Sequence, residues 1–100
     1  MRKLMLSEIA QAIGGVATAD VQIEGICIDS RLCREGLLYI AIHGENFDGH
    51  DFTSGALANG ASAAMIHHDV DCDGVFIRVD DTRLALLRLA NWYRSTFDIP

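Results

Sequence analysis

The sequence predicts an α/β domain, on the border with α+β, in which a small mixed sheet is flanked by three helices. Apolar residues recur at helical spacing near both ends of the chain and in one short middle stretch, and short apolar or alternating runs lie between these stretches. With 100 residues, of which 50% are hydrophobic and 22% charged, the chain can form one packed core. We therefore expect a single domain over residues 1–100.

The first predicted element is a helix over residues 6–13, whose apolar side chains repeat at i, i+3, i+4 and i+7. Ser7 is expected to cap this helix and Gly14 to end it. A strand is predicted over 21–29. Its apolar residues change register around Gly25, so a β-bulge is expected there.

The middle of the chain alternates strands with one short helix. Residues 37–42 are apolar throughout, which predicts a strand buried on both faces. A short helix is expected to begin at Asp51 and to end at Asn59 and Gly60. Because Gly60 breaks the helical pattern, the run 61–66 is interpreted as a strand.

The last two elements have the clearest patterns. Residues 75–79 alternate between two faces and predict a strand. A helix follows, with Asp80 or Asp81 as its cap. One apolar stripe at helical spacing defines its buried face: Leu86, Leu89, Ala90, Tyr93 and Phe97.

Charge and composition argue against several classes of protein. There are 8 basic and 14 acidic residues, a net charge of −6, so a nucleic-acid partner is not expected. No apolar run approaches the roughly 20 residues of a membrane span. The cysteines, Cys27, Cys33 and Cys72, form no CxxC pair, so we expect unreactive thiols in a reducing, cytoplasmic compartment.

One acidic segment offers an alternative function. The run DVDCDG at 69–74 matches the opening of an EF-hand calcium loop that would end at Asp80. A small calcium-binding or protein-interaction module built on Asp69 to Asp80 is therefore the second hypothesis. Aspartate at position twelve is shorter than the usual glutamate, and Arg78 would lie beside the cation. We favour an acidic turn between two strands.

Two other combinations resemble catalytic or metal sites. Adjacent side chains of a strand point to opposite faces, so His67 and His68 are not expected to share a metal ion. Ser54 lies near His50 and Asp51 in the sequence, but no GxSxG motif surrounds it. We predict no catalytic residue and no metal ligand in this chain.

Two polar segments follow predicted strands: IDSR at 28–31 and GENFDGHDF at 44–52. If the strands are neighbours, the two segments lie side by side. They would then offer a hydroxyl, an amide, an aromatic face, an arginine and glycines that allow close backbone approach. The alternative is that Asp29, Ser30, Asp48 and Asp51 serve only as turn and cap residues. The residues alone leave both interpretations open.

A wider pattern resembles a known family. The motifs are CIDSR at 27–31, EGLLYIAIHGENFDGHDF at 35–52, GAxAAMI at 60–66 and VDDTRLALxxLA at 79–90. Together they are similar to the N-terminal domain of the Mur ligases of peptidoglycan synthesis. The similarity is greatest to the MurF type, which joins D-alanyl-D-alanine to UDP-N-acetylmuramoyl-tripeptide. The resemblance implies that this domain binds the UDP end of the UDP-N-acetylmuramoyl-peptide substrate.

The resemblance also assigns candidate residues. Ile28 and Ser30 match one cluster of substrate contacts in the related tripeptide-forming enzyme, and Glu45, Asn46 and Phe47 match a second. Glu45 departs from that enzyme, so a role through its backbone is expected. With neighbouring groups included, the predicted UDP-binding residues are Ile28, Ser30, Arg31, Gly44, Glu45, Asn46 and Phe47.

The resemblance places the chemistry elsewhere in the parent enzyme. It implies that ATP and Mg²⁺ bind a central domain, and that a C-terminal domain closes over the reaction. This chain has no GxxxxGK[ST] phosphate loop, and its only lysine is Lys3. We therefore expect it to hold no cofactor, to be inactive as a ligase by itself, and to have those two domains as its partners.

Overall fold

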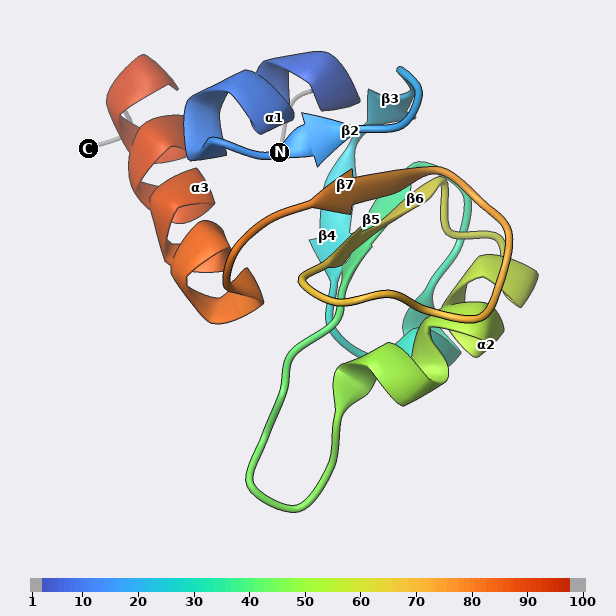
Figure 1. Ribbon diagram of the computed structural model, residues 1–100. Coiled ribbons are helices and arrows are strands. Elements are labelled where there is room, and N and C mark those ends of the chain that lie inside the picture. Colours follow the sequence, from blue (N-terminus) through green and yellow to red (C-terminus); the bar gives the residue numbers. More distant parts are fainter. Residues whose placement is uncertain (1–2, 98–100) are drawn as a thin grey trace.

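The computed structural model describes residues 3–97, with side chains as far as Tyr93. A central sheet is packed between α1 and α3 on one face and α2 on the other (Figure 1). In chain order the elements are β1 (Leu4–Met5), α1 (Leu6–Ile13), β2 (Val16–Ala17), β3 (Gln22–Ile23), β4 (Gly25–Cys27), the 3₁₀ turn η1 (Ser30–Leu32), β5 (Leu37–Ile40), the 3₁₀ turn η2 (Gly49–Phe52), α2 (Thr53–Ala58), β6 (Ala63–Ile66), β7 (Phe76–Arg78) and α3 (Thr82–Phe97).

The main sheet is mixed, as predicted. Its five strands lie in the order β2-β7-β6-β5-β4. Strands β4 to β7 are parallel to their neighbours, and β2 pairs antiparallel with β7 at one edge. Strands β1 and β3 form a separate antiparallel pair.

Strand β5 is buried along its whole length, which confirms the expectation for its apolar run. Its side chains alternate between the two faces of the sheet. Leu38 and Ile40 enter the core formed with α1 and α3, whereas Tyr39 enters the core on the α2 side. The central strands are thus covered on both faces, and ligands can approach only at their ends.

The cap of α1 differs from the prediction, although the helix spans Leu6–Ile13 as expected. Ser7 lies inside its first turn rather than before it. Both the backbone N–H and the hydroxyl of Ser7 donate to the Asp20 carboxylate, each at 2.9 Å. A carboxylate from a distant loop therefore interacts with the positive end of the helix, where an anion is stabilising. The predicted stop is confirmed, because Gly14 adopts φ 76° in the left-handed region.

The predicted strand over 21–29 is divided in two, and no bulge is present. Strand β3 ends at Ile23 and pairs with β1, whereas β4 begins at Gly25 and joins the main sheet. The change of apolar register thus marks a change of sheet. A Cβ atom on Gly25 would lie 2.8 Å from Leu37 Cδ2, so the glycine allows β4 to pair closely with β5.

The caps of the later helices follow the prediction in part. Asp51 does not cap α2, because η2 precedes that helix and Asp48 accepts from His50 N at 3.0 Å instead. Asp81 caps α3 by accepting from Arg83 N at 2.9 Å.

The predicted apolar stripe on α3 is confirmed at three positions and wrong at one. Leu89 is buried and Leu86 and Tyr93 are half-buried, but Ala90 is exposed. The side chain of Phe97 lies outside the described residues.

Candidate functional site

The carboxyl ends of β4 and β5 meet at one edge of the sheet. The two strands pair in parallel, from Gly25 opposite Leu37 to Cys27 opposite Tyr39, so the polar segments that follow them lie side by side as expected. Between them is a cavity of about 540 Å³, a volume typical of small-ligand sites. The cavity is lined by Ile28, Asp29, Ser30, Arg31, Tyr39, Phe47 and Phe52.

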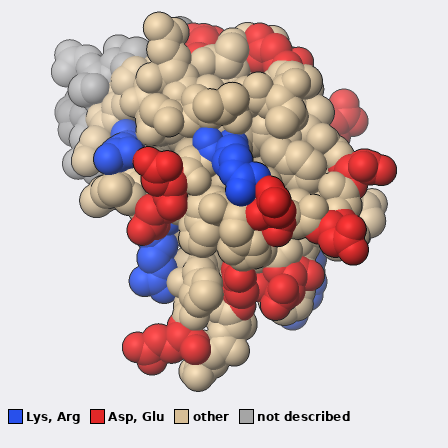
Figure 2. Space-filling model, in the orientation of Figure 1, with Lys and Arg blue, Asp and Glu red and all other residues tan. Residues whose placement is uncertain are grey.

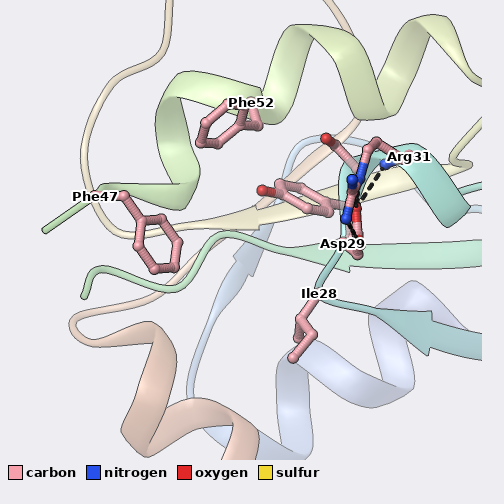
Figure 3. A pocket seen from close by; sticks show the side chains of 7 residues that line it. Ile28, Asp29, Arg31, Phe47 and Phe52 are labelled. Atoms are coloured by element: carbon pink, nitrogen blue, oxygen red, sulfur yellow. Dashed lines mark hydrogen bonds and ion pairs between the residues drawn. The ribbon is translucent and has the colours of Figure 1, made fainter.

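Apolar side chains form one side of this cavity (Figure 3). Phe47 comes from the loop after β5 and Phe52 from η2, and their exposed fractions are 58% and 50%. Tyr39 is buried behind them, and its hydroxyl donates to the Gly49 carbonyl at 2.7 Å. Burial, with a smaller contribution from Cys33, raises the pKa of Tyr39 to about 12, so the hydroxyl keeps its proton. The two accessible rings offer faces on which a flat ligand can stack.

An ion pair forms the polar side. Arg31 donates to the Asp29 carboxylate through Nε at 3.1 Å and Nη2 at 2.8 Å, and its backbone N–H donates at 3.0 Å. The side-chain hydrogen bonds from Arg31, then its backbone hydrogen bond, lower the pKa of Asp29 to about 2. Asp29 thus has the turn-and-cap role, while Arg31 is the cation nearest the cavity.

Among the described residues, the carbonyl of Ser30 has a hydrogen-bond partner, whereas its hydroxyl has none. Asn59 Nδ2, from the end of α2, donates to the Ser30 carbonyl at 2.9 Å and fixes the turn. Within the described part of the chain, no hydrogen bond engages Ser30 Oγ. The hydroxyl is therefore available to a ligand in the cavity.

The structure divides the predicted site residues into two groups. Ile28, Ser30, Arg31 and Phe47 line the cavity. The other three, Gly44, Glu45 and Asn46, belong to the loop that extends away from the body (green in Figure 1) and do not line it.

The loop is closed by a hydrogen bond of its own. The Gly44 N–H donates to the Phe47 carbonyl at 2.8 Å, so these two backbone groups already have partners. Sequence reasoning missed Phe52 and Tyr39 as lining residues. Phe52 falls inside the short helix expected from Asp51, but in the structure it ends η2, before α2 begins, and its ring is half exposed.

One thiol beside the cavity, that of Cys33, has the low reactivity expected for it. The Sγ atoms of Cys27 and Cys33 both approach the Asp29 carbonyl, at 2.8 and 3.6 Å. Burial first, and then the neighbouring Cys27, raises the pKa of Cys33 to about 12. A thiol with such a pKa remains protonated near neutral pH and is a poor nucleophile.

The expectation for the adjacent histidines was wrong in its geometry. Strand β6 ends at Ile66, so His67 and His68 are not held to opposite faces, and their ligand nitrogens lie within 4.8 Å of each other and of His50. Yet the rings of His50 and His68 are stacked, with centroids 3.7 Å apart and planes 24° apart. Metal ions bind in the plane of an imidazole, so two stacked rings cannot direct their lone pairs at one ion.

The acidic segment from Asp69 is not arranged as a calcium site. Asp69 forms an ion pair with Arg78 from β7, which removes the first carboxylate of the supposed loop. The segment before it is strand β6 rather than a helix. The calcium-binding alternative is not supported.

Charge is distributed without a cationic patch on the face that Figure 2 shows, where Lys and Arg side chains lie singly among acidic ones. A ligand with negative charge must therefore be held by local donors such as Arg31. No helix within residues 3–97 has both the length and the apolar character needed to cross a membrane.

Comparison with known proteins shows to which family this chain belongs. A family model described as "Mur ligase family, catalytic domain" matches residues 22–94. The chain belongs to the Mur ligase family. It is 37% identical over 96 residues to the UDP-N-acetylmuramoyl-tripeptide–D-alanyl-D-alanine ligase of Escherichia coli, covering 95% of this chain and 21% of that protein. The chain thus spans about a fifth of the curated Mur ligases it matches.

Solved structures of Mur ligases have the same fold. MurF from Acinetobacter baumannii superposes with a TM-score of 0.86 at 29% identity, over 96% of this chain and 22% of that one. MurF from Thermotoga maritima, solved in complex with ADP, gives 0.68 at 30% identity, over 73% of this chain and 17% of that one. The predicted fold, a mixed sheet with three helices similar to a Mur ligase N-terminal domain, is confirmed.

Proposed function

We propose that residues 1–100 form the substrate-recognition domain of a MurF-type ligase and bind the UDP end of UDP-N-acetylmuramoyl-tripeptide. The cavity between the loops after β4 and β5 carries this proposal, because it combines aromatic faces, one cation and one available hydroxyl. The parent enzyme would join D-alanyl-D-alanine to the tripeptide in an ATP-dependent reaction in the cytoplasm. The chain lacks a phosphate-loop motif, so ATP and Mg²⁺ would bind a central domain, and a C-terminal domain would close over the reaction. These two domains would be its partners.

Each lining group has a proposed partner on the nucleotide. The uracil ring stacks against Phe47 and Phe52, which leaves its polar edge toward the extended loop. Asn46 in that loop can donate and accept at once, as a uracil edge requires. Arg31 and the Ser30 hydroxyl face the diphosphate, whose oxygens accept hydrogen bonds from both.

Titration of the protein with UDP, followed by NMR, tests the site directly. Binding should move the amide resonances of residues 28–31 and those of Phe47 and its neighbours in 44–49. Unchanged resonances in both segments at millimolar UDP would show that the cavity is not a uridine nucleotide site. Movement of only one segment would refute the proposal that the two loops form one site.

Paired variants assign the contacts. Base stacking on an aromatic ring contributes about 1–3 kcal/mol, so Phe52→Ala should weaken UDP binding roughly 5- to 150-fold. Leu87→Ala is the control, because Leu87 is exposed to a similar extent, 58% against 50%, and lies on α3. Arg31→Ala should weaken binding about 1.5- to 5-fold, because its charge is largely solvated, whereas Arg34→Ala should not. Equal effects within either pair would contradict the assignment.

A further inference from the structure

A cluster of titratable groups outside the cavity holds the loop that carries Phe47. Asp48, the next residue, accepts hydrogen bonds from two histidines that come from different segments. His50 Nδ1 lies 2.6 Å from Asp48 Oδ1, and His68 Nε2 lies 2.8 Å from Asp48 Oδ2. Since His68 follows β6, the second contact ties the loop after β5 to the end of the neighbouring strand.

The hydrogen-bond partners fix the protonation state of His50. Its Nε2 faces the backbone N–H of His67 at 3.0 Å, and an N–H group can only donate. Nε2 is therefore an acceptor, and the proton lies on Nδ1, where it is donated to Asp48. His50 is neutral and buried, with a side chain that is 1% exposed. Burial is the main cause that lowers its pKa, against the opposing effect of Asp48.

The partners of His68 require the opposite state. Its Nδ1 lies 2.9 Å from the Asp69 carbonyl and its Nε2 faces the Asp48 carboxylate, and both oxygens only accept. Both ring nitrogens must then carry protons, so the arrangement is that of an imidazolium cation. The hydrogen bond to Asp48, followed by that to the Asp69 carbonyl, raises the pKa of His68 above its ordinary 6.5.

The surrounding charges favour the same state. Burial would raise the pKa of Asp48, but hydrogen bonds from His50 N, His68 and the His50 ring outweigh it and lower that pKa. The carboxylate of Asp69 forms an ion pair with Arg78 of β7, and the ring of His50 stacks on that of His68. The charged or titratable groups that face His68 are Asp48, His50, Asp51, His67 and Asp69.

We propose that Asp48 is a positioning residue for the nucleotide pocket and that protonated His68 holds it in place, so that ligand binding is coupled to the protonation of His68. This inference rests on the proposed function of the cavity. Phe47 lines the cavity and directly precedes Asp48 in the chain. Loss of the His68 contact therefore removes one of the constraints on the wall against which the base stacks, while the hydrogen bonds from His50 to Asp48 remain. Binding in turn favours the protonated form of His68, because coupling between two sites is reciprocal.

The sign of the pH dependence follows. A group whose pKa is raised on folding contributes fully below its ordinary pKa, and the contribution is lost as the pH rises through the folded-state pKa. Affinity for the nucleotide should therefore fall as the pH rises above about 6.5. We expect a loss of about 1.5- to 5-fold, because the His68 side chain is 47% exposed and its ion pair is partly screened.

Calorimetric titration with UDP-N-acetylglucosamine between pH 5.5 and 8.5 tests the coupling. This probe is a diphosphate diester, so its phosphates do not change charge over the range. His68→Gln should bind at every pH as weakly as the wild type does at high pH. His68→Arg, with a permanent cation, should restore tight binding and remove the pH dependence. If His68→Gln keeps the wild-type pH profile, the coupling is wrong.

A control and an independent readout separate the two proposals. His43 is the matched control, because it lies near the same Asp48 oxygen but at 3.6 Å, beyond hydrogen-bond distance. His43→Gln should keep the wild-type pH profile. If His43→Gln abolishes the pH dependence, the role of His68 is wrong. Without any ligand, NMR titration of the His68 ring should give a raised pKa that falls in Asp48→Asn. A wild type that binds at no pH refutes the proposed function and the coupling with it. Binding without pH dependence, with an ordinary His68 pKa, refutes the coupling alone.

Discussion

Replacement of Gly49 by alanine tests whether close backbone packing sets the shape of the loop beside the cavity. A Cβ atom at this position would lie 2.7 Å from Ile42 N and 2.8 Å from Ile42 O, which is 0.6 to 0.7 Å closer than ordinary contact at 3.4 Å. Both neighbours are backbone atoms and cannot rotate away. The Gly49 N–H also donates to the Ile42 carbonyl at 2.8 Å, so relief of the clash must break or lengthen that bond.

The expected cost follows from this overlap. Overpacking that forces a backbone shift costs about 1–3 kcal/mol, which lowers the Tm of a domain of this size by roughly 5–20 °C. Thermal unfolding followed by circular dichroism measures this change. UDP affinity should fall as well, because the Tyr39 hydroxyl bonds the Gly49 carbonyl and Phe47 lies two residues away.

Gly55→Ala is the matched control, because the same methyl group would meet no atom within 4 Å there. Gly55 lies inside α2 and is exposed, so alanine should stabilise the protein by about 0.5–1 kcal/mol. A Gly49→Ala protein that melts within about 2 °C of the wild type would refute the steric reasoning, given the shift of 4–8 °C expected per kcal/mol. Equal destabilisation by both variants would do the same.

Two further predictions concern a buried hydroxyl and the acidic turn. Thr82 Oγ1 donates to the Ala41 carbonyl at 2.7 Å, so Thr82→Val should cost about 1–3 kcal/mol in urea unfolding. Thr53→Val should cost nothing, because the Thr53 hydroxyl is buried without a partner among the described residues. Calcium at millimolar concentration should leave the Tm unchanged against a chelator, because Asp69 pairs with Arg78. A site filled to 100 times its Kd would add about 2.7 kcal/mol, so a rise of several degrees would contradict this.

The sequence predicts well those elements that depend on local periodicity. Strands β5 and β6, helix α1 and the start of α3 are defined by which neighbours along the chain are apolar, and both faces of β5 are covered as its composition requires. Gly14 ends α1 because a left-handed residue is needed there, which is also a local property. Adjacent placement of the two polar loops followed once β4 and β5 were taken as neighbours.

The errors concern contacts between residues far apart in the chain. Serine is a residue type that often caps helices, but at this helix end Asp20 accepts the hydrogen bond instead. Asp20 is 13 residues away in the chain, so the local sequence does not predict this contact. The apolar register around Gly25 is compatible with a bulge or with a change of sheet, and only the pairing of β3 with β1 decides. The histidine cluster was missed because it depends on where β6 ends, one residue before His67.

The position of Glu45 is compatible with the proposed binding of a diphosphate by an acidic chain. A carboxylate beside the phosphates would be repulsive, and the family resemblance placed Glu45 among the substrate contacts. Glu45 is exposed in the extended loop and does not line the cavity, so water screens its charge from the Arg31 side. Arg31 is also held in place by Asp29, whose carboxylate partly compensates the positive charge but fixes the guanidinium at the rim. Affinity should then depend more on stacking against Phe47 and Phe52 than on ionic contacts, and it should decline only weakly as salt is added.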